Sequence, residues 1–430
     1  MSYFKIEGGQ PLNGTITPSG NKNEALPALM TCLLTDEPII LHNMPKIRDV
    51  LTACDILEDM GVQVAWSKEN TLKLEATSQL GFKIPNRELC TRIRASILLL
   101  GPMLARFKKV ELPLPGGDAI GARKLDVHFE CVEALGGHLE LSDTIHGAVK
   151  HLKGTELFLD EPSVTATENV LLLSVLAEGV TTIYNAACEP HVKGLCRLLI
   201  SMGAKIEGVG TNSLTVTGVS KLHGTEHTIS PDFMEVASFL CLGAITEGTL
   251  TIDKIVYEDL RFMLKVFKRL GINPDFDGKD KLTITKDKKS LVMEQAIGNQ
   301  APLSIFSGPW PAFPTDVMSV AMVAATQSYG TMLFHEKMFE GRMFFTDKLI
   351  SMGANLVLCD PHRVVITGPR QLHGIRVSSP DVRAGMAVLI ATLAAKGTSE
   401  IHNVYQIDRG YQNIEEKIQK LGGKILRFQN

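Results

Sequence analysis

Six times along this 430-residue chain, an apolar stretch of helical character runs into a glycine and then into an apolar, strand-like stretch. The glycines are Gly61, Gly136, Gly203, Gly271, Gly353 and Gly422, at spacings of 75, 67, 68, 82 and 69 residues. A period of about 70 residues is too long for a helical solenoid or a propeller blade. It suits a unit of about two helices and several strands.

Each unit has a second landmark, an apolar helix that ends in a short loop before a strand. The expected helices span 24–34, 90–105, 168–177, 232–245, 316–326 and 381–395. Several begin near Ser, Asp or Pro, which satisfy free amides at a helix start, and several end in a glycine before a β-branched run. The pattern predicts a βαβαββ unit. Six such units form either two similar three-unit domains or one continuous assembly, and periodicity alone leaves both open.

Composition favours a soluble globular enzyme. Hydrophobic residues make up 44% of the chain, which is ordinary for an enzyme. There is no apolar run of the length that spans a membrane, and the first residues lack a signal pattern. The net charge of −3 gives no global field for nucleic acid. The eight cysteines form no Cys-x-x-Cys pair, which favours reduced thiols in a cytoplasmic protein over a disulfide or zinc framework.

The most distinctive segment is the loop 114–123, Leu-Pro-Gly-Gly-Asp-Ala-Ile-Gly-Ala-Arg. Its three glycines allow flexibility, and it carries Asp118 and then Arg123. Such a loop can bring a carboxyl to a substrate and cradle an anion with backbone amides. Its glycine spacing fits no dinucleotide or P-loop fingerprint, and a plain surface turn explains it equally well.

Four further segments carry polar residues at predicted helix starts or in loops. Lys22 and Asn23 begin an apolar helix, where free amides suit phosphate or carboxylate, although a solvated lysine is the commoner case. Asp316 follows the proline-rich run 308–315 and is expected either to cap a helix or to act as a base. Asp381 with Arg383, and Asp408 with Arg409, are expected to form local ion pairs.

Five motifs in combination resemble the UDP-N-acetylglucosamine enolpyruvyl transferases, over residues 4–427. They are Ser19-Gly20-Asn21-Lys22-Asn23, Arg94-Ala95-Ser96-Ile97, Gly121-Ala122-Arg123, Phe313-Pro314-Thr315-Asp316 and Ile407-Asp408-Arg409-Gly410-Tyr411. The resemblance implies an α/β fold of two similar domains, each with three βαβαββ units and inward helices (an inside-out α/β barrel). The implied domains are 22–232, with a mobile catalytic loop at 114–123, and 1–21 plus 233–430.

The implied reaction transfers the enolpyruvyl group of phosphoenolpyruvate to the 3′-hydroxyl of UDP-N-acetylglucosamine and releases phosphate. This is the first committed step of peptidoglycan precursor synthesis, and it proceeds by addition and elimination through a tetrahedral intermediate. It needs no cofactor or metal. The two substrates are the expected partners, with no nucleic acid or membrane, and the protein is expected to be a monomer or weak homo-oligomer.

The resemblance also assigns residue roles. Asp118, Asp316, Lys22 and Arg409 are the catalytic candidates: Asp118 as proton donor to C3 of phosphoenolpyruvate, and Asp316 as acceptor of the 3′-hydroxyl proton. Lys22, Arg123 and Arg409 match residues that grip phosphoenolpyruvate. The remaining substrate-binding candidates are Asn23, Arg94, Asp126, Ser163, Val164, Arg342, Asp381 and Arg383.

Departures from the family pattern leave alternatives open. Asp118 replaces the usual loop cysteine, which predicts resistance to fosfomycin, because a carboxylate attacks an epoxide less readily than a thiolate. Glu161 and Gly341 differ on the sugar-nucleotide side. A paralogue for another UDP-sugar, a shikimate-pathway enolpyruvyl transferase and a non-catalytic binding paralogue are therefore the alternatives.

Overall fold

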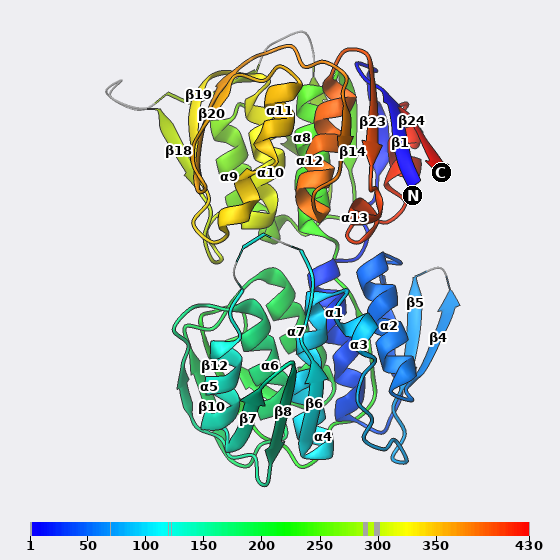
Figure 1. The fold of residues 1–430 in the computed structure, drawn as a ribbon, viewed down its shortest axis with the longest axis vertical. Helices are drawn as coiled ribbons and strands as arrows, with labels where there is room; N and C mark the ends of the chain where they lie inside the picture. Colours follow the sequence, from blue (N-terminus) through cyan, green and yellow to red (C-terminus); the bar gives the residue numbers. More distant parts are fainter. Residues whose placement is uncertain are drawn as a thin grey trace. The chain divides into compact units, whose positions relative to one another are not determined.

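The computed structural model describes residues 2–68, 70–118, 120–121, 123–286, 291–295 and 302–429. The chain divides into two compact units, seen in Figure 1. Unit 1 contains Met1–Ser19, Ala119–Ala122 and Pro231–Asn430, and unit 2 contains Gly20–Asp118 and Arg123–Ser230. The chain passes from one unit to the other between Ser19 and Gly20 and again between Ser230 and Pro231. Residues 119–122, which the sequence-based limits assign to the 22–232 domain, belong to unit 1.

Unit 2 consists of three helix-and-sheet repeats. Its inner helices are α1 (Lys22–Met30, continued by η1, Thr31–Leu34), α4 (Leu100–Phe107, preceded by α3, Arg87–Cys90, and η2, Arg94–Leu99) and α6 (Val164–Ser174). Its outer helices are α2 (Arg48–Asp59), α5 (Asp126–Ala134) and α7 (Pro190–Ser201). Its sheets have the strand orders β13-β3-β5-β4, β6-β8-β7 and β11-β12-β10-β9.

The strands of unit 2 are short. They are β3 (Ile39–His42), β4 (Gln63–Lys68), β5 (Thr71–Glu75), β6 (Lys109–Pro113), β7 (Gly137–Leu141), β8 (Thr144–Val149), β9 (Glu156–Phe158), β10 (Val180–Tyr184), β11 (Lys205–Glu207), β12 (Ser213–Thr217) and β13 (Thr225–Thr228). The middle sheet has three strands where the other two have four, so the second repeat departs from the full βαβαββ pattern.

Unit 1 repeats the same plan. Its inner helices are α8 (Phe233–Ile245), α10 (Thr315–Ala325) and α12 (Val382–Ala394), and these three pack against one another. Its outer helices are α9 (Arg261–Arg269), α11 (Thr346–Ser351) and α14 (Ile414–Lys420), and its short helices are η3 (Tyr257–Asp259), η4 (Glu340–Met343) and α13 (Tyr405–Asp408).

Three described sheets cover the helices of unit 1. Their orders are β15-β16-β14-β2, β17-β19-β21-β20 with β18 also paired to β19, and β22-β23-β1-β24. The strands are β1 (Ser2–Glu7), β2 (Gly14–Ile16), β14 (Gly248–Ile252), β15 (Asp275–Phe276), β16 (Leu282–Lys286), β17 (Leu291–Val292), β18 (Leu303–Phe306), β19 (Ser328–His335), β20 (Leu356–Asp360), β21 (Arg363–Gly368), β22 (Arg376–Ser378), β23 (Thr398–His402) and β24 (Lys424–Gln429).

The N-terminal strands complete sheets of C-terminal repeats. β1 pairs antiparallel with both β23 and β24, and β2 pairs parallel with β14. In unit 2, β13 returns from the end of that unit to pair parallel with β3 of its first repeat. The chain therefore begins in unit 1, builds unit 2, and comes back to finish unit 1.

The six repeat glycines follow the outer helices, which confirms the predicted junctions. Their φ angles lie between +80° and +101°. Side chains with a Cβ rarely adopt this left-handed region, so glycine is the residue that ends each helix at low cost. For example, α2 ends at Asp59, Gly61 has φ +100°, and β4 begins at Gln63.

The inner helices are buried around their whole circumference, as an apolar pattern without a polar stripe predicts. In α8 every residue from Phe233 to Ala244 is buried, and in α12 every residue from Val382 to Leu393. One expected inner helix is wrong in detail. The stretch 90–105 breaks after Cys90, because Ile93 is extended at φ −130° and ψ 141°, and it resumes as η2 and α4.

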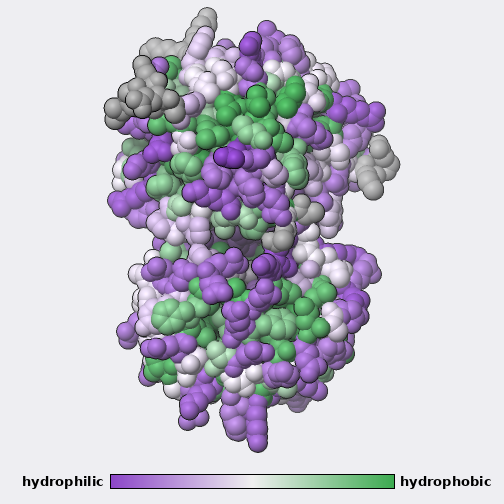
Figure 2. Space-filling model, turned by 60° about the vertical axis from the view of Figure 1, so that its left-hand side comes forward, coloured by the Kyte–Doolittle hydropathy of each residue, from purple (hydrophilic) through white to green (hydrophobic). Residues whose placement is uncertain are grey.

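Outward sheet faces expose some apolar side chains. On the sheet containing β19, Phe306, Tyr329 and Val357 are 46%, 54% and 61% exposed. Figure 2 brings this side forward, and apolar residues (green) gather there among charged ones (purple). None of the described helices is long and apolar enough to cross a membrane.

Candidate active site

Lys22 stands on the first turn of α1 in unit 2. The Asn21 side chain caps this helix by accepting hydrogen bonds from the amides of Asn23 (2.8 Å) and Glu24 (3.1 Å). Lys22 Nζ lies 2.6 Å from Asp49 Oδ2, and the two side chains are only 11% and 6% exposed. The ion pair therefore fixes the lysine in one place at a helix start, where an anion is favoured. Asn23 is half-buried beside it.

Arg94 and Arg123 form a second cationic group of unit 2. Arg94 Nη2 donates to the carbonyls of Arg123 (3.0 Å) and Lys124 (3.3 Å), and Arg123 Nη2 donates to the Asp118 carbonyl (2.9 Å). Burial, and then the charge of Arg123, lower the pKa of Arg94 to about 10. The Asp118 side chain is half-buried. These contacts bring together three predicted site residues, Asp118, Arg94 and Arg123.

Glycine is required where the loop passes over these arginines. A Cβ on Gly116 would lie 1.6 Å from the Thr91 carbonyl oxygen, and one on Gly117 would lie 2.9 Å from both Arg94 Cβ and Arg123 Nη2. Gly117 also has φ +107°. The loop backbone therefore packs closely on Arg94. Of the predicted loop 114–123, Ala119 and Ala122 lie outside the described residues.

The starts of α5 and α6 carry the other unit 2 candidates. Asp126 is exposed in the first turn of α5, and Ser163 caps α6 through the Ala166 amide at 3.4 Å, so Val164 is the first helical residue. His128 links the two helices: its Nε2 lies 3.2 Å from Thr165 Oγ1, and its Nδ1 lies 3.1 Å from Asn169 Nδ2. Burial, and then the charge of Arg94, lower the pKa of His128 to about 3, so it is neutral.

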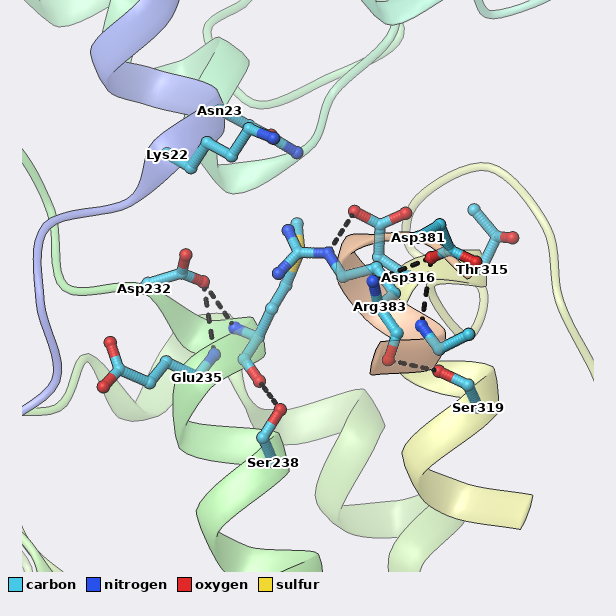
Figure 3. A network of polar contacts seen from close by, with 12 residues as sticks. Lys22, Asn23, Asp232, Glu235, Ser238, Thr315, Asp316, Ser319, Asp381 and Arg383 are labelled. Carbon is cyan, nitrogen blue, oxygen red and sulfur yellow. Dashed lines mark hydrogen bonds and ion pairs between the residues drawn. The ribbon is translucent and has the colours of Figure 1, made fainter. Parts of the chain in front are cut away.

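Asp316 is the centre of the unit 1 group. The structure shows that it is not the N-cap: α10 begins at Thr315, Pro314 occupies the cap position, and Asp316 lies in the first turn. Its carboxylate instead bonds to two guanidinium groups, Arg342 Nη2 at Oδ1 and Arg383 Nε at Oδ2, the latter at 3.0 Å. Figure 3 shows Arg383 and Asp316 pointing toward each other from α12 and α10.

Arg383 is a buried residue of unit 1, with 5% of its side chain exposed. Its Nη1 lies 3.3 Å from the Tyr411 hydroxyl, and its Nη2 contacts Met234 Sδ at 2.7 Å. Burial alone would lower the pKa of Arg383, but the charge of Asp316 opposes this and the net shift is upward. Arg383 thus holds the Asp316 carboxylate in place.

The acids of the two expected local ion pairs have other partners. Asp381 caps α12 by accepting from the amides of Arg383 (2.8 Å) and Ala384 (3.0 Å). Asp408 pairs with Arg427 on β24. Arg409, 5% exposed, donates to Gln406 Oε1 at 2.9 Å.

Several site residues carry no local sequence signal. Asp49, His128 and Arg427 come from elements distant in sequence from their partners Lys22, Thr165 and Asp408, so only the fold shows these pairings. Each unit presents cations and a carboxylate, which suit anionic substrates and proton transfer. Within the described ranges, no group of His, Cys, Asp or Glu is arranged to hold a metal ion.

The family model for EPSP synthase (3-phosphoshikimate 1-carboxyvinyltransferase) matches residues 6–418. The chain belongs to the EPSP synthase family. Within this family it is similar to proteins named UDP-N-acetylglucosamine 1-carboxyvinyltransferase. That of Borreliella burgdorferi is 51% identical over 100% of both chains, that of Treponema denticola 50% over 99% of both, and that of Bradyrhizobium diazoefficiens 48% over 99% of this chain and 97% of its own. The predicted resemblance and the transferase class are confirmed.

Solved structures of EPSP synthase relatives share the fold. The enolpyruvyl transferase NikO from Streptomyces tendae matches with a TM-score of 0.88 at 22% identity, over 99% of both chains. EPSP synthase from Acinetobacter baumannii matches with a TM-score of 0.75 at 18% identity, over 100% of both. These likenesses confirm the α/β class with inward helices and outward sheets.

Proposed function

We propose that the protein transfers the enolpyruvyl group of phosphoenolpyruvate to the 3′-hydroxyl of UDP-N-acetylglucosamine, with release of phosphate. The observation that carries this proposal is the similarity of about half of all residues, over the whole chain, to proteins named for that reaction. The polar groups of the two units supply the required chemistry: an acid for C3, a base for the hydroxyl, and cations for phosphate and carboxylate.

Asp316 is the proposed base. Its carboxylate, oriented by the two guanidinium groups, is proposed to accept the 3′-hydroxyl proton as the oxygen attacks C2. Both arginines were assigned by sequence to substrate binding. Arg383 is better explained as a buried partner that positions Asp316, since only 5% of its side chain is exposed. Arg342 retains a proposed role near the substrate.

Asp118 is the proposed acid that protonates C3. A free aspartic acid is almost fully ionised at neutral pH, so it can donate only if the bound substrates hold it protonated. The proton then moves from the carboxyl to C3, and Asp118 recovers it when the intermediate loses a C3 proton and phosphate.

Lys22, Arg123 and Arg409 are the proposed ligands of phosphoenolpyruvate, and Arg94, which donates to the Arg123 carbonyl, is a further proposed ligand. Lys22 stands at a helix start and is held by Asp49, which suits a phosphate oxygen. Asn23, Asp126, Ser163, Val164 and Asp381 are proposed to line the sugar-nucleotide side. Asp381 acts there through the start of α12 that it caps.

The second candidate is a paralogue that acts on another UDP-sugar. It is favoured by Glu161 and Gly341, which depart from the family pattern. The structure gives a reason for the glycine: a Cβ at 341 would lie 2.8 Å from the Ile120 carbonyl, and the Gly341 amide donates to that carbonyl at 2.9 Å. Loop packing therefore accounts for Gly341 without a change of sugar, which favours the first candidate.

The proposed reaction places the protein in peptidoglycan precursor synthesis, and so in cell-wall formation, cell shape and division. We further infer a cytoplasmic location, action as a monomer or weak homo-oligomer, and resistance to fosfomycin through Asp118. The two domains are proposed to be 22–232 and 1–21 plus 233–430, with 114–123 as the catalytic loop.

Phosphate release tests this function. Purified protein is assayed with phosphoenolpyruvate and UDP-N-acetylglucosamine, and the mass of the product is measured by mass spectrometry. Other UDP-sugars and shikimate-3-phosphate serve as rival acceptors. We expect release with UDP-N-acetylglucosamine and a product heavier by one carboxyvinyl group. Faster turnover with another UDP-sugar would favour the paralogue, and silence with every acceptor would point to a binding protein.

A further inference from the structure

Arg427 is the most heavily engaged cation of unit 1 that the proposed reaction does not use. It lies on β24, the last strand, beside β1 (Figure 1). Its Nη1 and Nη2 bond in parallel to Asp408 Oδ2 (2.8 Å) and Oδ1 (2.7 Å). Its Nε and Nη2 bond to Glu415 Oε1 (2.5 Å) and Oε2 (3.0 Å). One guanidinium thus holds two carboxylates, each through two hydrogen bonds, which is the strongest geometry such a group can form.

This guanidinium is itself fixed in place. It lies over the Phe4 ring, 4.7 Å from the ring centre, and Phe4 is fully buried. Three-quarters of the Arg427 side chain is covered, and the Asp408 and Glu415 side chains are each 17% exposed. Hydrogen bonds to Asp408, and then to Glu415, raise the pKa of Arg427. A planar cation on a rigid aromatic platform is a firm anchor.

The two carboxylates bracket the segment 409–414. Arg409 directly follows Asp408, and Tyr411, in the same segment, supports Arg383 through its hydroxyl. α13, which precedes Arg409, has only four residues and cannot hold itself. Asn413, near the other end, has φ +47°, so the segment turns sharply before α14. Fixing Asp408 and Glu415 therefore fixes both ends of the segment that carries Arg409.

We propose that Arg427 is a positioning residue for phosphoenolpyruvate binding: by holding Asp408 and Glu415 it fixes the 409–414 segment that carries Arg409. This inference rests on the proposed function, in which Arg409 binds phosphoenolpyruvate. Arg427 acts through Arg409 and does not touch the substrate.

The test compares Arg427→Ala and Arg427→Lys by phosphate release. We expect Arg427→Ala to raise the KM for phosphoenolpyruvate by about tenfold or more, and the KM for UDP-N-acetylglucosamine by less than about threefold. Lysine should restore part of the loss, because it keeps the positive charge beside Asp408 and Glu415.

A purely structural role predicts lower stability with no difference between the two KM values. An unchanged KM for phosphoenolpyruvate in Arg427→Ala, or an equal rise in both KM values, would overturn the proposal. Arg376→Ala is the matched control: Arg376 lies on β22 of the same sheet, pairs with Glu400, and is 76% exposed, so its kinetics should match the wild type.

Hydrogen exchange gives a readout independent of turnover. Amides of 409–414 should exchange faster in Arg427→Ala and in Glu415→Gln, which keeps Arg427 and serves if the alanine variant fails to fold. Unchanged exchange in Glu415→Gln would count against the proposal. A wild type that releases no phosphate would overturn the proposed function instead, and the exchange result would still stand.

Discussion

Asp316 makes two kinds of contribution, and different substitutions separate them. Its carboxylate accepts hydrogen bonds from two guanidinium groups and is proposed to accept the substrate proton. Asp316→Asn keeps the shape and can still accept from Arg383, but it cannot take the proton, so kcat should fall by about 10²- to 10⁴-fold. Asp316→Ala should also destabilise unit 1 by about 3 kcal/mol, because buried Arg383 loses its charged partner.

Steady-state phosphate release and denaturant unfolding measure the two effects. Both variants should unfold at lower denaturant than the wild type, the Ala variant at the lowest, because asparagine removes the charge but keeps an acceptor for Arg383. A kcat within a few-fold of wild type in Asp316→Asn would exclude Asp316 as the base.

The side chain at position 118 determines both whether C3 can be protonated and how the protein responds to an epoxide inhibitor. Asp118→Ala should lose most turnover because no group remains to protonate C3. Asp118→Cys places a thiol there, and a thiolate opens an epoxide far more readily than a carboxylate does. Fosfomycin should therefore add covalently to the Cys variant and leave the wild type unmodified, as read by intact-protein mass spectrometry. An adduct on wild-type Asp118 contradicts this expectation.

The loop that carries Asp118 depends on a backbone contact that only glycine permits. Gly116→Ala would put a Cβ 1.6 Å from the Thr91 carbonyl oxygen, so the loop must move away from Arg94. A displacement of about 1 Å can cost about a hundredfold in rate, and we expect a loss of that order in kcat with a small effect on unfolding. Gly81→Ala in the same unit is the control, because its Cβ would meet nothing within 4 Å. Equal kinetics in the two variants would show that the loop position is not critical.

The helix pair α5 and α6 is linked by a histidine that must stay neutral. The pKa of His128 falls to about 3 in the folded protein, from an ordinary value of 6.5. Below pH 6.5 the unfolded chain binds a proton that the folded chain does not, so this residue lowers stability progressively between pH 6.5 and 3. At pH 5 the loss is about 2 kcal/mol.

His128→Gln can still hydrogen-bond to Thr165 and Asn169 but does not titrate. Its unfolding free energy should therefore fall less than that of wild type from pH 7 to pH 5, in urea unfolding at both values. Parallel pH profiles for the two proteins would mean that His128 is protonated in the folded state.

At the scale of the whole molecule, the sequence period predicted the repeats well and the polar pairings poorly. The glycine junctions are visible in sequence because each is a local requirement for positive φ after a helix. The break of the helix at Ile93 was not predicted, because the extended conformation of this residue is set by the fold and not by local helix propensity. The partners of Asp408 and Lys22 were missed because each lies on a different element.

Positions at helix starts were the easiest site residues to find, because capping chemistry is local. Asp232 and Asn21 cap α8 and α1 as such patterns suggest. Asp316 shows the limit of that argument: Pro314 took the cap position, which left the carboxylate for two arginines that lie 26 and 67 residues further along the chain. Only the repeat architecture of unit 1 brings Asp316 and these two arginines together.

Two separate apolar cores, one in each unit, make a prediction about unfolding. Leu29 belongs to the core built from unit 2, and Phe239 to the core built from unit 1, and both are fully buried. Truncating either to alanine should cost about 3 to 5 kcal/mol, through lost contacts and a cavity. Since neither core cluster includes residues of the other, the loss should fall on one unit.

Hydrogen exchange across a urea series measures this unit by unit. In Phe239→Ala, peptides from 233–268 and 315–351 should lose protection at lower urea, while peptides from 22–59 keep the wild-type midpoint. Leu29→Ala should give the reverse, and so controls for a general loss of stability. If both variants shift both sets of peptides together, the chain unfolds as one cooperative body, and the repeats build a single folding unit despite their two cores.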